Sequence, residues 1–306
     1  MKPIAQRLRL YGLLTLILTA VGTVGQFLAI HFGYSQQMGV YSQSNPIGPI
    51  VGWCLFAFVL LLAGFALLLP KESDVTPVPP CGNGLAFLSA MSGGIAICAS
   101  LFMLLDVMKT TGPIKTLSLL LMILSLPAGF YLIRSATTRK TEDKLLTILG
   151  FFPVLWLAVC LIRIYFDRTS AINDPVQLLL QLSLAAIMLY FLTELRSRVG
   201  KPDYRLRLAA GGVATLLGMA SSVTLILLYF DLSNSTTYNP GFPNRTEVIR
   251  GELFLAVTEL LMTLYAAGRL AALLRAKGET VAVETAEETA AEAASVSDGK
   301  DASETL

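Results

Sequence analysis

Long runs of apolar residues alternate with short polar connections along the first 277 residues of the chain. A stretch of about 18 or more apolar residues is long enough to cross a bilayer as a helix. Eight stretches have this length, and they lie at residues 10–32, 47–69, 85–108, 116–133, 145–166, 176–195, 208–230 and 249–274. The connections between them are too short to form a core of their own. We therefore predict an all-α polytopic membrane protein with eight transmembrane helices and no soluble catalytic domain.

The ends of the odd-numbered runs resemble one another. The third run ends in LFMLLDVMKTTGP, the fifth in LIRIYFDRTSAINDP and the seventh in LILLYFDLSNSTTYNP, so Asp106, Asp167 and Asp231 each close an apolar run that a proline follows. Tyrosine favours the membrane–water boundary, and proline is tolerated in the first turn of the next helix. The pattern predicts four helical hairpins. Internal duplication into two four-helix halves would explain the likeness, and so would convergence of separate hairpins on the same local chemistry.

The basic residues lie mainly in alternate connections. Fifteen lysine and arginine residues fall in the N-terminal segment, the even-numbered connections and the start of the C-terminal tail, against five in the odd-numbered connections. Loops rich in lysine and arginine stay in the cytoplasm. Both termini are therefore predicted to be cytoplasmic, as an even number of spans requires. The compact loops are typical of a bacterial inner-membrane protein.

The C-terminal tail differs from the rest of the chain. The whole sequence is 54% hydrophobic and 14% charged, whereas soluble domains carry about 25% charged residues. Residues 278–306 hold eight acidic residues and one lysine, and few large apolar side chains that could form a core. We predict a transmembrane domain over residues 1–277 and a disordered acidic cytoplasmic tail over residues 278–306. This tail either keeps the protein soluble at that end or docks a cytoplasmic partner protein.

Small residues line one face of the third and seventh runs. Gly93 and Gly218 are 125 residues apart, the same separation as Asp106 and Asp231. Small side chains let helix backbones approach closely. We therefore predict helix-packing seams at Gly93 and Gly218, and the wider set of seam residues is Ser89, Gly93, Ala214, Gly218 and Ser222. A ligand groove along these faces is the alternative.

The sequence lacks the motifs of common catalytic sites. His31 is the only histidine, which excludes a histidine-based metal cluster. No H-E-x-x-H, P-loop or G-x-S-x-G motif is present. We expect no enzymatic activity, no metal and no cofactor. The basic loops favour anionic lipid of the bilayer as their partner rather than nucleic acid.

The charged and polar residues inside the spans are the remaining candidates for a functional site. Glu259 lies deep in the last run, and Glu252 lies seven residues earlier on the same helix face. Gln26 and Gln181 are further polar residues within spans. An ionisable residue inside a span is costly, faces the bundle interior and is a functional candidate. Glu259 and Glu252 are therefore predicted to line a proton or ion path.

An acidic rim is predicted at the outer end of this path. It consists of the three run-ending aspartates and an arginine four residues before one of them, namely Asp106, Asp167, Asp231 and Arg163. Two functional hypotheses follow. The first is a small transporter or permease component that uses Glu259. The second is a non-enzymatic sensory, scaffold or assembly subunit that binds partner proteins, in which a protonated Glu259 only joins two helices by a hydrogen bond.

Overall fold

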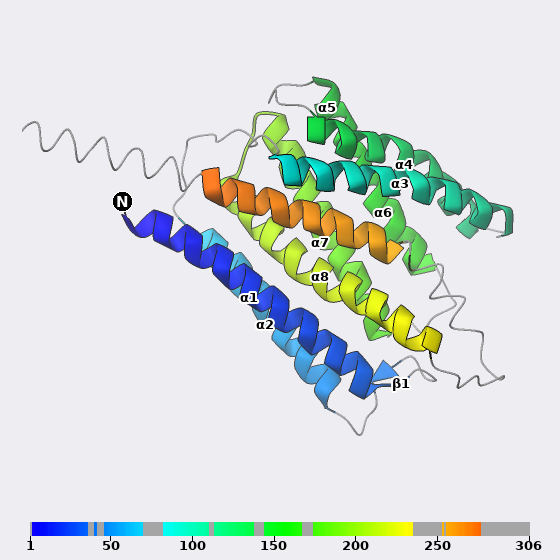
Figure 1. The fold of residues 1–306 in the computed structure, drawn as a ribbon, viewed down its shortest axis with the longest axis horizontal. Coiled ribbons are helices and arrows are strands. Elements are labelled where there is room, and N and C mark those ends of the chain that lie inside the picture. Colours follow the sequence, from blue (N-terminus) through cyan, green and yellow to red (C-terminus); the bar gives the residue numbers. More distant parts are fainter. Residues whose placement is uncertain are drawn as a thin grey trace, which may run out of the picture.

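The chain forms a bundle of long helices in a computed structural model (Figure 1). The structure describes residues 2–35, 40–41, 46–69, 82–109, 113–137, 144–166, 174–234, 253 and 255–276. The labelled helices are α1 (Lys2–Gly33), α2 (Ile47–Leu68), α3 (Asn83–Lys109), α4 (Pro113–Thr137), α5 (Lys144–Leu149), α6 (Phe151–Phe166), α7 (Pro175–Arg198) and α8 (Tyr204–Asn234). A further helix, Leu255–Ala276, is called the C-terminal helix below. Two short strands, β1 (Tyr34–Ser35) and β2 (Val40–Tyr41), pair antiparallel between α1 and α2.

Within the described residues, seven helices are long and apolar enough to cross a membrane, one fewer than the sequence predicts. The third predicted span, residues 85–108, is the one that is missing from this set. It lies in α3, a helix of 27 residues whose side chains are described only in part, and its described apolar stretch is Asn83–Cys98. The eighth span therefore stays a prediction. The predicted fifth span is present as Lys144–Phe166. It includes both α5 and α6, which are separated at Gly150.

The prolines lie where their backbone chemistry is tolerated. Pro113 begins α4, and Pro175 occupies the first turn of α7, where a missing N–H leaves no helical hydrogen bond unmade. Pro153 follows the break between α5 and α6, because proline cannot donate to the carbonyl group four residues earlier. Pro127 lies inside α4.

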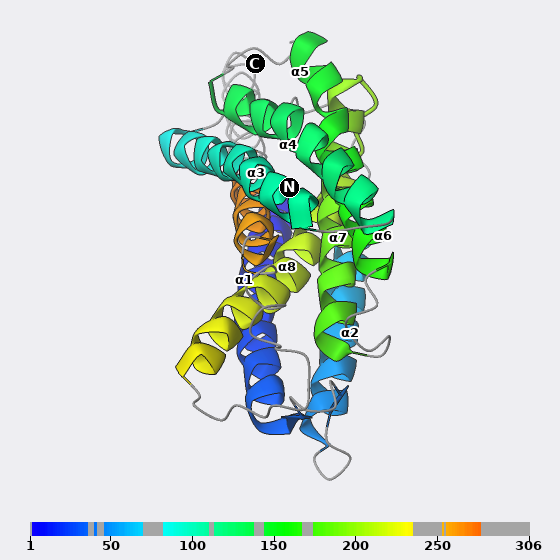
Figure 2. The ribbon, with the colours of Figure 1, turned by 90° about the vertical axis from the view of Figure 1, so that its right-hand side faces the viewer.

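The helices pack as two groups joined by a central pair. α1 and α2 pack together, α3 packs on α4, and α4 packs on α6. α7 contacts α6 and α8, and α8 contacts α1 and α2, so α7 and α8 connect the two groups. Figure 2 shows the α3–α4 pair and the α1–α2 pair at opposite sides of the bundle. Of the most apolar 18 residues in each span, 72% are buried in α8 and 17% in α2, which makes α8 central and α2 peripheral.

The outer faces of these helices are strongly apolar. Large side chains such as Leu16, Trp53 and Leu68 are 70%, 72% and 82% exposed. A soluble protein rarely exposes apolar surface of this extent, which a lipid bilayer would cover. Length, composition and exposed surface are thus compatible with a multi-pass membrane protein.

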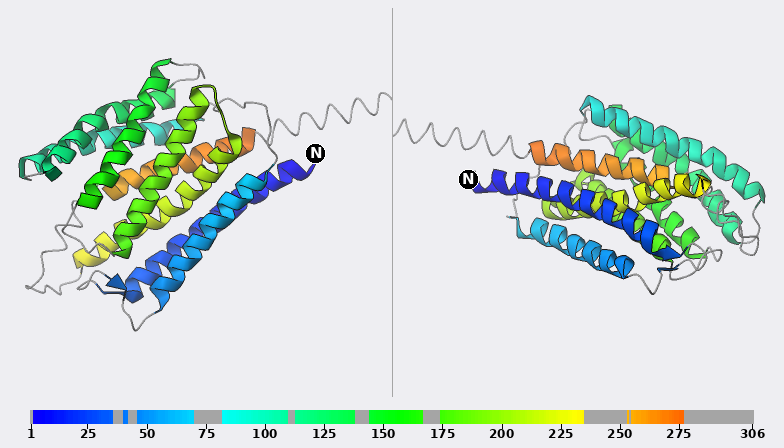
Figure 3. Two further views of the ribbon diagram at one scale, coloured as in Figure 1. Left: turned by 180° about the vertical axis from the view of Figure 1, so that it is seen from behind. Right: turned by 60° about the horizontal axis from the view of Figure 1, so that its bottom comes forward.

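The contacts at several glycines fix the relative directions of the helices. Gly93 and Gly129 approach each other between α3 and α4, which run antiparallel. The C-terminal helix runs antiparallel to α8, because Thr263 lies against Gly218 and Leu270 against Gly211. Leu274 near its end packs against Gly12 of α1. The start of α1 and the end of the C-terminal helix therefore lie at the same end of the bundle, as both views in Figure 3 show.

Candidate functional site

Glu259 is buried between the C-terminal helix and α7. Only 1% of its surface is exposed. The hydroxyl group of Ser183 in α7 donates a hydrogen bond to Oε1 of Glu259. Ser183 lies eight residues beyond Pro175, about 12 Å along the helix axis. The carboxyl group is therefore inside the apolar part of the bundle, nearer the end where α7 begins.

Among the described residues, the surroundings of Glu259 offer hydroxyl groups and no charged partner. Ser221 of α8 lies beside the carboxyl group, but Oε2 of Glu259 has no hydrogen-bond partner in the described part of the chain. The hydroxyl of Thr263 donates instead to the backbone oxygen of Glu259 at 2.8 Å. An ionised carboxylate in such a place would lose its hydration without gaining a counter-charge. The predicted proton-binding role of Glu259 stays a prediction, with hydroxyl groups as its described neighbours.

The rest of the predicted ion path and its outer rim is only partly visible. Glu252 and Asp167 lie outside the described residues. Asp106 and Asp231 fall inside the ends of α3 and α8, but their side chains are not described. Arg163 is half-buried on α6. The predicted row of Glu252 and Glu259 and the predicted rim therefore stay predictions.

A different acidic residue is buried at the end of the bundle where α7 begins. Asp174 is 4% exposed, and its Oδ1 accepts the backbone N–H of Val176 at 3.0 Å, which caps α7. Tyr41 of β2 lies close enough to interact electrostatically with Asp174, and its hydroxyl accepts a hydrogen bond from Gln26 of α1 at 3.3 Å. Burial raises the pKa of Asp174 to about 6, against the opposing effect of the N–H groups of Val176 and Gln177. These interactions link α1, β2 and α7. Asp174 was not among the site residues predicted from the sequence.

The largest group of buried charges lies where α7 ends and α8 begins. Glu194 of α7 has no exposed surface. Its Oε1 lies 3.1 Å from Nη2 of Arg198 and 4.0 Å from Nη2 of Arg269. The hydroxyl of Tyr265 donates to both carboxylate oxygens, at 3.0 and 3.3 Å, and accepts a hydrogen bond from Nε of Arg269 at 3.1 Å. Arg207 of α8 also acts on Glu194 electrostatically, and we call these five residues the Glu194 cluster.

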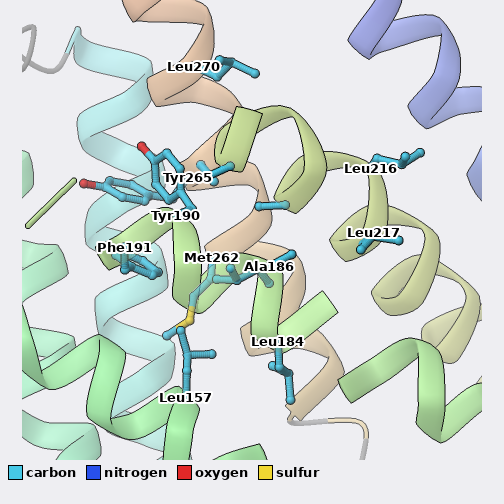
Figure 4. Packing of buried hydrophobic residues seen from close by; sticks show 14 of the residues in the cluster. Leu157, Leu184, Ala186, Tyr190, Phe191, Leu216, Leu217, Met262, Tyr265 and Leu270 are labelled. Carbon is cyan, nitrogen blue, oxygen red and sulfur yellow. The ribbon is translucent and has the colours of Figure 1, made fainter. Parts of the chain in front are cut away.

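Aromatic rings enclose the Glu194 cluster. The rings of Phe191 and Tyr265 are stacked with centroids 5.8 Å apart. The guanidinium of Arg198 lies over the ring of Tyr131 at 5.7 Å, and that of Arg269 lies over Tyr265 at 5.4 Å. Figure 4 shows Phe191 and Tyr265 close to Tyr190 in the hydrophobic core. A guanidinium group over an aromatic ring is stabilised by cation–π attraction, and this attraction is stronger in a site with little water.

The residues of the Glu194 cluster were not among the site residues predicted from the sequence. Glu194 and Arg198 are four residues apart on one helix face, which is the spacing of an ion pair. Arg269 lies within the last apolar run, where an unpaired cation would be costly. These two signals were available, but nothing in the sequence shows that the two segments meet.

The predicted seam residues lie at close helix contacts. A Cβ atom on Gly93 would approach the backbone oxygen of Gly129 to 2.5 Å, and a Cβ atom on Gly218 would collide with the side chain of Thr263. The hydroxyl of Ser89 donates to the backbone oxygen of Leu132 in α4 at 2.6 Å. The two remaining predicted seam residues are fully buried in α8, namely Ala214 and Ser222. The tight surroundings leave no room for a ligand groove at either glycine.

One open groove lies on the outside of the bundle, between α4 and the α5–α6 segment. Its volume is about 610 Å³, and it is lined by Leu126, Pro127, Phe130, Ile133, Arg134, Thr137, Leu145 and Leu149. Apart from Arg134 and Thr137 the lining is apolar, like the rest of the outer surface. The groove brings no acid, base or nucleophile near a substrate.

The buried polar groups therefore lie at three depths: Asp174 near the start of α7, Glu259 within the bundle and the Glu194 cluster at the end of α7. Among the described residues, no group of three or more histidine, cysteine, aspartate or glutamate side chains is placed to hold a metal ion. This arrangement supports two kinds of chemistry: binding of a proton at Glu259, and binding of a charged group at the Glu194 cluster. Comparison with protein-family models, curated proteins and solved structures finds no match for the chain.

Proposed function

We propose that the protein is a small membrane transporter or permease component in which Glu259 takes up and releases a proton. The observation that carries this proposal is the burial of Glu259 with a hydroxyl partner and no cation among the groups acting on it. A buried carboxyl group without a counter-charge favours its neutral form. Loss of the proton would leave an unpaired charge among three helices, and a change in their packing or entry of water would relieve it.

The position of Glu259 supports a coupling role. α7 and α8 join the α3–α4–α6 group to the α1–α2 pair, and Glu259 faces Ser183 of α7 and Ser221 of α8. A change of charge at this junction would act on the contact between the two groups. Movement of one helix group against another is the usual way in which transporters expose a buried site to alternate sides. In the alternative, a sensory or scaffold subunit, the same carboxyl group is only a fixed hydrogen-bond partner.

The first expected result concerns Glu259 itself. Glu259→Gln keeps the size and the hydrogen bond to Ser183 but removes proton exchange. We expect purified wild-type protein in liposomes to carry protons down an imposed pH gradient, reported by an internal pH-sensitive dye, and Glu259→Gln to lose this flux. Thermal unfolding of the Gln variant should stay close to wild type, because the amide replaces the carboxylic acid as a hydrogen-bond acceptor. Glu259→Leu should be less stable than Glu259→Gln, because it leaves the hydroxyl of Ser183 without this acceptor.

A chemical probe provides the control for that measurement. An apolar carbodiimide reacts with protonated carboxyl groups in apolar surroundings, so mass spectrometry should find it on Glu259 and not on the ion-paired Glu194. Labelling of Glu259 should decrease as the pH is raised. Equal proton flux in wild type and Glu259→Gln, or no flux in either, would contradict the transporter proposal. A stoichiometric protein partner in a pull-down would then favour the scaffold alternative.

We also propose the full topology: eight spans in four hairpins, with both termini in the cytoplasm of a bacterial inner membrane. It is supported by the basic loops and by the shared location of the start of α1 and the end of the C-terminal helix. Single cysteines in a cysteine-free background test it. A membrane-impermeant thiol reagent should label Ser42→Cys and Asn239→Cys in intact cells, and Thr137→Cys and Gly200→Cys only after permeabilisation. Labelling of position 137 in intact cells would overturn both the orientation and the number of spans.

A further inference from the structure

The Glu194 cluster and the nearby Tyr190 contain buried hydrogen-bond donors that no described group satisfies. Arg207 is 3% exposed, yet its Nε and Nη2 atoms have no hydrogen-bond partner within the described residues. The same holds for Nε of Arg198 and for the hydroxyl of Tyr190, which is 1% exposed. Buried polar groups in proteins are nearly always hydrogen-bonded, because desolvation without a partner is strongly destabilising. These donors therefore call for an acceptor from outside the described part of the chain.

The charges indicate that this acceptor is an anion. Within the five residues of the Glu194 cluster, Arg198, Arg207 and Arg269 bring three positive charges and Glu194 one negative charge. Asp203 is the acidic residue nearest to Arg207 in the sequence. It is half-buried, and its carboxylate already accepts the N–H of Leu206 at 3.1 Å.

The fold adds a second source of positive potential. Arg207 lies in the first turn of α8, a helix of 31 residues. The N-terminus of a helix carries partial positive charge and exposed N–H groups, which favour anions. Arg207 also interacts electrostatically with Tyr190, so these two residues, each with unsatisfied donors, lie near each other across α7 and α8. A water molecule could satisfy one donor, but it would leave the excess positive charge in place.

We propose that Arg207 and Tyr190 bind a phosphate-type oxyanion between α7 and α8. Guanidinium groups match the geometry and charge of phosphate oxygens, and a tyrosine hydroxyl supplies a further donor. The phosphate belongs either to the headgroup of an anionic lipid in the leaflet at this end of the bundle or to a soluble phosphate compound. The site does not depend on the role of Glu259, which lies ten residues earlier than Arg269 in the C-terminal helix, about 15 Å along its axis.

Ligand-dependent thermal unfolding tests the site. The full-length protein is purified in a phosphate-free neutral detergent and stripped of lipid. Unfolding is then followed with inorganic phosphate at constant ionic strength, and separately with mixed micelles of phosphatidylglycerol or phosphatidylcholine. We expect phosphatidylglycerol to stabilise the wild type more than phosphatidylcholine does. An additional effect of inorganic phosphate would identify a soluble phosphate as the ligand, and its absence would identify the lipid headgroup.

Three variants separate a binding site from general charge effects. Arg207→Gln should weaken the apparent affinity for the stabilising anion about tenfold or more, since hydrogen bonds to charged groups are lost. Arg196→Gln removes the same charge from an exposed position at the same end of α7 and should keep the anion effect. Tyr190→Phe should unfold like wild type without anion, because its hydroxyl has no described partner, and should bind the anion several-fold more weakly.

The pattern across these variants decides the proposal. Tyr190→Phe remains decisive if Arg207→Gln does not fold, because a purely structural hydroxyl would not alter the anion dependence. Stabilisation of the wild type by neither anion would overturn the site. So would an anion effect of equal size in wild type, Arg207→Gln and Tyr190→Phe.

Discussion

Glu194→Gln is expected to be the most destabilising single substitution in the protein. The carboxylate is fully buried and is the acceptor for Arg198 and for the hydroxyl of Tyr265. Its removal leaves buried arginine side chains without a counter-charge and turns an amide N–H₂ group toward a guanidinium. Breaking a buried ion pair by removal of one partner costs about 3–5 kcal/mol. We therefore expect a large loss of thermal stability and of folded yield in detergent.

Two comparisons make this expectation specific. Arg196 lies on the same helix but is exposed, so Arg196→Gln should change stability by less than about 0.5 kcal/mol. Arg198→Gln should destabilise the wild type, but it should have a smaller effect in the Glu194→Gln background, where the ion pair is already broken. Additive effects of Glu194→Gln and Arg198→Gln would show that the two residues do not form the pair. A Glu194→Gln variant as stable as wild type would contradict the whole cluster.

Gly93→Ala is expected to have the next largest effect. The added methyl group would lie 2.5 Å from the backbone oxygen of Gly129 and 2.7 Å from Cγ1 of Ile133. A backbone oxygen cannot turn away as a side chain can, so α3 and α4 must separate. Overpacking of this kind costs about 1–3 kcal/mol. Thermal unfolding of the purified variant should show this loss.

The adjacent residue is a matched control. A methyl group added to Gly94 would have nothing within 4 Å, so Gly94→Ala should leave stability unchanged or raise it by up to about 1 kcal/mol through higher helix propensity. At the other seam, Gly218→Ala would collide with the side chain of Thr263. Shortening that side chain by Thr263→Ala should recover part of the loss, whereas no side-chain change can relieve the clash of Gly93 with a backbone oxygen. Equal stability of Gly93→Ala and Gly94→Ala would contradict the close approach of α3 and α4.

The apolar runs were enough to predict an all-helical chain and the position of most of its helices. A helix that crosses a bilayer needs its apolar residues in one continuous run, and this information is local. Seven of the eight predicted spans appear among the described helices, and Pro113 and Pro175 begin helices as their chemistry requires. Gly93 and Gly218 also stand out in the sequence, because small residues mark places where backbones can approach.

Only the tertiary structure decided which faces and charges meet. Lipid tails are as apolar as leucine, so an apolar face does not specify whether it contacts lipid or another helix. Glu194 and Arg198 therefore looked like charges at a membrane boundary until packing placed Tyr265 and Arg269, more than 70 residues away in the chain, against the same carboxylate. Glu259 could be recognised from the sequence as a charge in a span, but its partner Ser183 could not. Such pairings depend on the arrangement of helices that are distant in sequence, and a one-dimensional pattern of polar and apolar residues carries no information about it.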